Sequence, residues 1–186
     1  MVTNTTCLDS KTRWKEIIAG TDNPRHRHML EIGLKHWWAE VVYDIDTIME
    51  TITPDISYRL YGTNALGPGR HIDTAAQARA MYLAQFAAGL MPGGPIDNHC
   101  LACGDWGYSA HGVYTLAMPG AGLFLPEEEI DPDQLYLFQT HMSVVVPFKG
   151  DLMAGEILYM SAPFNVEPTD HATIAHLLGW DPQSYV

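Results

Sequence analysis

Apolar positions divide the chain into a helical first half and a strand-rich second half. From Met29 to Val42 they recur at the three- and four-residue spacing of one helix face, which predicts an amphipathic helix ending near Tyr43. A shorter helix is expected over 45–51 and an alanine-rich one over 75–90, with a short strand over 56–61 between them. This order predicts a core with one wall of helices.

Beyond Pro95 the pattern becomes that of an antiparallel sheet. Strands are expected over 99–103, 106–118, 135–148 and 152–163. The last two are joined by a turn at Lys149-Gly150-Asp151. The segment 119–134 is too rich in Pro, Gly and acidic residues to pair, so it is expected to form a surface excursion or lid.

The chain is expected to form one domain. Its 186 residues, 47% hydrophobic and 17% charged, supply enough apolar mass for one sizeable core. Residues 1–22 are predicted to be a polar lead-in with one short amphipathic turn at 13–19, residues 23–166 the domain proper, and residues 167–186 a tail with one helical turn near its end.

Charge and cysteine content narrow the class of partner and the compartment. A net charge of -12 with only 10 unclustered basic residues disfavours nucleic acid and anionic membranes, since phosphate binding needs grouped Lys and Arg. The sequence shows no signal peptide and no apolar run long enough for a membrane span. Three cysteines fit a reducing compartment. We therefore expect a cytoplasmic protein without structural disulfides.

The order of elements and motifs carries a resemblance to a known family. A long helix, a short helix before Thr53-Pro54-Asp55, a strand, a glycine-bearing loop, an alanine-rich helix with Met81-Tyr82, a strand opened by Asn98-His99 and the hairpin at 149–151 follow one another. In this the chain resembles the SnoaL-like branch of the nuclear transport factor 2-like (NTF2-like) superfamily over roughly 25–164.

That resemblance implies an α+β fold, the NTF2-like cone, in which three N-terminal helices pack on a curved, mainly antiparallel sheet and enclose a deep apolar pocket. Members of the family include dehydratases, isomerases, epoxide hydrolases, polyketide cyclases and lyases, together with binding or assembly modules. The resemblance therefore implies the fold more specifically than the activity.

Two histidines are implied as catalytic residues by the same resemblance. In the similar dehydratases a His that opens the strand after the third helix points into the pocket, and His99 occupies that place here. On the next-to-last strand Gln139, His141 and Ser143 share a face that matches polar pocket-lining positions, which makes His141 a catalytic and Gln139 a substrate-binding candidate. The opposite face is expected to pack on helices: Phe138, Thr140, Met142 and Val144. The alternative for both histidines is a surface, core or oligomer position.

The family also pairs a first-helix carboxylate with histidine, but the aligned position here is Val41. Glu40 and Asp44 are therefore the candidates, and Asp44 serves equally well as a helix cap. The position of the ketosteroid isomerase base aligns with Leu60, which argues against that chemistry. Tyr58, on the same strand face, can donate to a substrate oxygen or can be a core tyrosine.

No metal or cofactor is predicted. Cys100 and Cys103 are half of a zinc site, and on a strand their sulfurs face opposite sides. A metal built from distant histidines stays open. The run Gly107–Gly112 is a near miss for a nucleophile elbow, and His111 within it is expected to line the pocket or to pair across the sheet. No glycine-rich phosphate loop follows a strand.

These patterns and the resemblance together predict a cofactor-independent lyase, of dehydratase or retro-aldol, formaldehyde-releasing type. It would act by general acid/base catalysis on a bulky hydroxylated aromatic molecule such as a lignin-derived diaryl compound or a polyketide, against an aromatic wall that includes Trp37 and Trp38. The alternatives are an isomerase or cyclase of the same fold and a non-catalytic binding module. An epoxide hydrolase ranks lower because only one plausible carboxylate is visible.

The expected partners are a small hydrophobic substrate and further copies of the chain. The resemblance implies that the convex sheet face is buried in a dimer or trimer.

Overall fold

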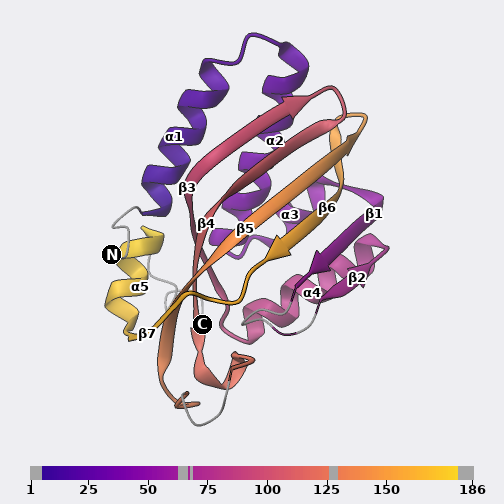
Figure 1. Ribbon diagram of the computed structural model, residues 1–186. Coiled ribbons are helices and arrows are strands. Elements are labelled where there is room, and N and C mark those ends of the chain that lie inside the picture. The colour runs from indigo at the N-terminus through magenta and orange to yellow at the C-terminus, as the bar shows by residue number, and fades with distance from the viewer. Residues whose placement is uncertain (1–5, 63–66, 68, 126–129, 180–186) are drawn as a thin grey trace.

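A computed structural model describes residues 6–62, 67, 69–125 and 130–179, with residues 93–100 described by their backbone alone. Its helices are α1 (Cys7–Ala19), α2 (Pro24–Val41), α3 (Ile45–Glu50), α4 (Ala75–Ala87) and α5 (His171–Leu178), with a 3-10 turn at Gly120–Gly122 (Figure 1). Its strands are β1 (Ile52–Tyr61), β2 (Arg70–Ile72), β3 (Met91–Gly104), β4 (Gly107–Pro119), β5 (Leu135–Lys149), β6 (Leu152–Met160) and β7 (Asn165–Thr169). No helix in these ranges is both long and apolar enough to cross a membrane.

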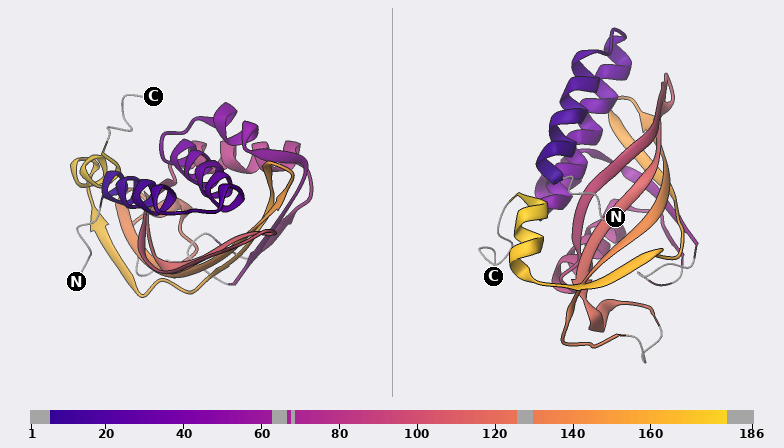
Figure 2. Two further views of the ribbon diagram at one scale, coloured as in Figure 1. Left: turned by 90° about the horizontal axis from the view of Figure 1, so that it is seen from above. Right: turned by 60° about the vertical axis from the view of Figure 1, so that its left-hand side comes forward.

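The strands form one curved, mixed sheet. Their order is β2-β1-β6-β5-β4-β3, with β7 paired to β5, and only the β1–β6 pair is parallel. Seen from above, the sheet bends into a half-barrel around α1 and α2 (Figure 2). This is the predicted α+β arrangement of helices on a curved, mainly antiparallel sheet.

Most predicted elements are present, with shifted ends. Asp44 caps α3, accepting a hydrogen bond from the backbone N–H of Thr47, and Gly150 turns β5 into β6 with a φ of 62°. The strand expected from Ile56 begins four residues earlier and passes through Pro54. The pairing register of β1 with β6 shifts between Ile52 and Ser57, and such an irregularity is where a strand tolerates proline.

The segments on either side of the predicted domain form longer helices than expected. The expected single turn in the lead-in is part of the full helix α1, which starts in a capping box made by Thr6 and Asp9. From its first turn Cys7 packs in one buried cluster with Ile174 and Leu178 of α5. The lead-in and the tail therefore share one core.

Helix α2 is fixed to the sheet at its N-terminal end. Asn23 caps it, and Pro24 occupies the first turn, where a missing N–H costs nothing. His26 lies 3.2 Å from Asp105 in the β3–β4 turn, and His28 and Arg25 contact Asp151 in the β5–β6 turn. These contacts join the start of α2 to two turns of the sheet.

We expect Gly155→Ala to destabilise the protein. A Cβ at this position in β6 would lie 2.0 Å from the backbone carbonyl oxygen of Ser57 in β1, and a backbone atom cannot move aside as a flexible side chain can. The cost should be about 1–3 kcal/mol of unfolding free energy, measured by urea denaturation.

Gly20→Ala is the matched control, because the nearest atom to its added Cβ lies 3.5 Å away. Equal midpoints for the two variants would contradict the proposed clash.

Candidate active site

A cavity of about 180 Å³ lies between the helices and the concave face of the sheet. Its wall is mainly apolar and aromatic, with rings contributed by Trp14, Trp37, Tyr61, Tyr82, Phe86, Tyr108 and Tyr114. Gly69 and Arg70 are exposed and also line it, which marks where the cavity reaches the surface. A space of this shape suits an apolar small molecule.

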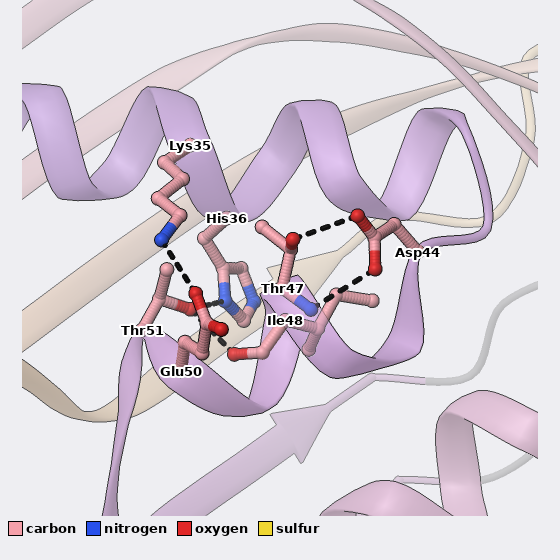
Figure 3. A network of polar contacts seen from close by, with 7 residues as sticks. All are labelled: Lys35, His36, Asp44, Thr47, Ile48, Glu50 and Thr51. Atoms are coloured by element: carbon pink, nitrogen blue, oxygen red, sulfur yellow. Dashed lines mark hydrogen bonds and ion pairs between the residues drawn. The ribbon is translucent and has the colours of Figure 1, made fainter.

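His36 of α2 is the buried polar centre of this cavity, with a side chain only 3% exposed. Its Nδ1 lies 2.6 Å from Thr51 Oγ1, and Thr51 in turn donates to the carbonyl oxygen of Ile48 at 2.6 Å (Figure 3). Its Nε2 lies 3.0 Å from the hydroxyl of Tyr82. Both ring nitrogens are therefore engaged, one by α3 and its cap, the other by α4.

Two carboxylates approach the same Nε2. Glu40 Oε1, one helical turn along α2, lies 3.3 Å away, and Glu156 Oε1 of β6 lies 4.0 Å away. Their side chains are 18% and 20% exposed, and both line the cavity, so this exposed area belongs to the cavity wall. A buried imidazole with two carboxylates beside one nitrogen forms a cluster of groups that can donate and accept protons.

Burial and mutual charge change the protonation of this cluster. Burial together with the charge of Glu40 raises the pKa of Glu156 to about 7, although the charge of His36 acts in the opposite direction. Burial alone would lower the pKa of His36, but contact with Glu40 and the charge of Glu156 outweigh it, so the pKa of His36 is raised. A carboxyl group that titrates near neutrality can both donate and accept a proton at physiological pH.

Two tyrosines extend the cluster away from the imidazole. Tyr82 and Tyr58 place their hydroxyls 3.3 Å apart, and both side chains are buried. Burial, reinforced by nearby carboxylates, raises the pKa of both phenols well above 10. They stay protonated and act as hydrogen-bond donors.

The structure brings some predicted residues to the cavity and leaves others outside it. Glu40 and Trp37 line the cavity, and Tyr58 stands behind Tyr82. The carboxylate of Asp44 instead binds Thr47 at the start of α3 (Figure 3). Trp38 does not line this cavity but lies under the ammonium group of Lys11 in a separate groove of the helical surface.

The face of β5 that was predicted to pack on helices is also the face that lines the cavity, and the face predicted to line it points away. Met142 and Val144 line the cavity, so strand alternation places His141 on the convex face, where it is exposed. His111 is also exposed, with its ring stacked 6.4 Å from that of His141. Gln139 is buried and donates to Thr115 Oγ1 at 3.3 Å, outside the residues that line the cavity.

The side chain of His99 lies outside the described residues, so its proposed role stays a prediction. Its backbone belongs to β3, in a part where the pairing with β4 shifts register twice between Pro95 and Cys100.

Sequence reasoning missed His36, Glu156 and Tyr82 as site residues. The signal for His36 was available, since His36 and Glu40 stand four residues apart on the predicted helix and so share a face. Glu156 stands alone as an acid in an otherwise apolar strand, a further signal. In the described ranges no group of three or more His, Cys, Asp and Glu side chains is arranged to hold a metal ion.

The sequence matches no protein-family model, and no curated protein matches it significantly. Solved structures share its fold. An NTF2-like protein from Burkholderia xenovorans LB400 superimposes with a TM-score of 0.55 at 11% identity, over 82% of this chain and 97% of its own. A protein from Jannaschia sp. CCS1, provisionally named a SnoaL-like polyketide cyclase, gives 0.55 at 14% identity over 75% and 90%.

A third, from Xanthomonas campestris pv. campestris and provisionally named a polyketide cyclase, gives a TM-score of 0.52 at 10% identity over 73% of this chain and 91% of its own. At these identities the likeness concerns the fold, and the chain has the NTF2-like fold.

Proposed function

We propose that the protein is a cofactor-independent acid/base enzyme, a lyase that eliminates water or a small aldehyde from a hydroxylated aromatic molecule. The observation that carries the proposal is the meeting of His36, Glu40 and Glu156 at one nitrogen in the wall of an apolar cavity. A module that only stores an apolar ligand needs no such group of titratable side chains, so the cluster favours catalysis.

Glu156 and His36 would carry out the two proton transfers. Glu156, with a pKa of about 7, is protonated often enough to give a proton to a leaving hydroxyl. His36 Nε2, held beside Glu40, would take the proton from a second hydroxyl or from carbon. In the retro-aldol route that deprotonated hydroxyl becomes the aldehyde as the neighbouring carbon–carbon bond breaks, and the carbon that keeps the electron pair of this bond takes the proton from Glu156. The proton balance closes within the cluster, because one group gives a proton and another takes one.

The cavity limits the size of the reacting part. An apolar cavity of about 150 Å³ accepts a benzene ring, so about 180 Å³ holds roughly one ring. A two-ring substrate would extend past Gly69 and Arg70. An isomerase or cyclase of the same fold would use the same proton transfers without losing a fragment.

Glu156 also supports an alternative that the sequence ranked lower, an epoxide hydrolase, because that reaction needs paired carboxylates around one water. The sequence showed one plausible carboxylate, and the cavity wall holds two.

Mass spectrometry of products tests these alternatives. Purified protein, treated with a chelator and given no cofactor, is incubated with hydroxylated aromatic compounds, polyketides and epoxides, beside His36→Gln. Loss of the mass of water or formaldehyde, absent with the variant, supports the lyase, and gain of water indicates the hydrolase. A ligand that both proteins retain unchanged would contradict catalysis and favour a binding module.

We also propose that the convex sheet face joins copies of this chain. A convex patch, defined as His111, His141, Ile157, Tyr159 and Phe164, carries side chains that are exposed, among them Ile157 (37%), Tyr159 (55%) and Phe164 (53%). Most outward strand positions around it are uncharged, among them Ser109, Val113, Ser143 and Val145, and the charge of Arg59 beside Ile157 is paired with that of Asp73. Since copies with a net charge of -12 repel one another, an uncharged apolar face is the favoured place for contact.

Tyr159→Glu should therefore convert an oligomer to a monomer in analytical ultracentrifugation. Leu83→Glu, an equally drastic change at a 46% exposed position on α4, should leave the oligomer intact. A monomeric wild-type protein at micromolar concentration would contradict the proposal.

A further inference from the structure

The hydrogen bonds behind His36 determine which of its ring nitrogens carries the proton. Thr51 is fully buried at the C-terminal cap of α3, and its hydroxyl has one hydrogen for two neighbours. One neighbour, the carbonyl oxygen of Ile48 at 2.6 Å, can only accept. The hydroxyl hydrogen therefore points to Ile48, because two oxygen acceptors at this distance would otherwise repel each other.

The other neighbour is His36 Nδ1, also at 2.6 Å (Figure 3). With its hydrogen committed to Ile48, the Thr51 oxygen offers only a lone pair to the imidazole, so Nδ1 must be the donor. Neutral His36 then has its free lone pair on Nε2, the nitrogen that faces Tyr82, Glu40 and Glu156.

We infer that Thr51 is a positioning residue which holds His36 in the Nδ1–H form, so that Nε2 is the atom that exchanges protons at the site. This inference rests on the proposed acid/base function and deepens it. The arrangement is analogous to the group that orients the histidine of a catalytic triad, with the difference that Thr51 is uncharged. Thr51 fixes the orientation and the tautomer of the ring. The carboxylates on the cavity side determine how basic His36 is.

The groups around the imidazole explain why such a device is needed. Glu40 comes from α2 itself, Tyr82 from α4 and Glu156 from β6, and all lie on the Nε2 side. Two carboxylates would favour an N–H at Nε2, which would leave a neutral imidazole with no free lone pair toward the cavity. The acceptor at Thr51 opposes this preference by rewarding a proton on Nδ1.

The inference is tested by the tautomer of His36, read from long-range 1H–15N correlation spectra of the imidazole at a pH well above the pKa of His36. The His36 signals are assigned by their absence in His36→Gln. We expect Nδ1–H in wild type and in Thr51→Ser, which keeps the hydroxyl, and a change to Nε2–H in Thr51→Val. Thr53→Val, at another buried threonine, should leave the tautomer unchanged.

An Nε2–H tautomer in wild type would overturn the inference, even if Thr51→Val fails to fold. So would an unchanged tautomer in a folded Thr51→Val. On a compound that the wild type converts, Thr51→Val should lose about 10–100-fold in kcat, as is typical for groups that orient a ligand or base, with Thr51→Ser close to wild type. If the tautomer changes as expected and no compound in the panel is converted, the proton assignment stands and the proposed function fails.

Discussion

Glu156→Gln is expected to lower turnover about 10²–10⁴-fold, because the amide cannot exchange a proton with the substrate. The wild-type rate should fall as pH rises through about 7, where Glu156 loses the proton that it donates, and this limb should be missing from the residual activity of the variant. The measurement is a pH–rate profile on a compound identified by the product screen.

Glu50→Gln is the matched control, because Glu50 is an exposed carboxylate that pairs with Lys35 outside the cavity. An unchanged profile in Glu156→Gln would remove Glu156 from the chemistry and leave His36 with Glu40 as the acid/base pair among the described residues.

The second large effect concerns stability as a function of pH. The pKa of Glu156 rises from 4.5 in the unfolded chain to about 7 in the folded protein, so the folded protein binds this proton more tightly. The resulting stabilisation is complete below pH 4.5 and is lost as pH rises through 7. Because a tenfold difference in proton affinity corresponds to about 1.36 kcal/mol, the loss amounts to at most about 3 kcal/mol.

Glu156→Gln should therefore match wild type in unfolding free energy near pH 4.5 and exceed it above pH 7. His36, whose pKa is also raised, contributes with the same sign in both proteins, so the slope of the variant is reduced and not abolished. Urea denaturation followed by tryptophan fluorescence at several pH values measures both slopes. Parallel slopes would show that Glu156 titrates alike in the folded and unfolded states.

Most helices and strands of this protein can be predicted from its sequence because each is determined by a local pattern of residues. The apolar spacing predicts α2, Asp44 takes the capping role that was one of its two predicted roles, and the turn at Gly150 joins the predicted hairpin. The order of those elements was sufficient to predict the cone fold. Each of these features depends on neighbours within a few residues.

The site was harder to predict because it depends on which face of an element turns inward. Alternation correctly groups His141 with Gln139 and Ser143, but it does not say that Met142 and Val144 would be the pair that meets the cavity. That choice is made by helices packed far away in sequence. The approach of Glu156 to His36 could not be predicted for the same reason. The spacing along α2 places Glu40 beside His36, but it gives no information about which residue of β6 lies next to them.

The division of the cluster between α2 and β6 also bears on how the protein is made. During synthesis the imidazole of His36 leaves the ribosome well before Glu156, so no nascent chain carries the whole group until β6 has emerged. The parallel pairing of β1 with β6 is a long-range contact of the kind that forms slowly. Until it forms, His36 and Glu40 lack their buried acid. The proposed activity would therefore appear late in folding. Its appearance would report that β6 has paired with β1.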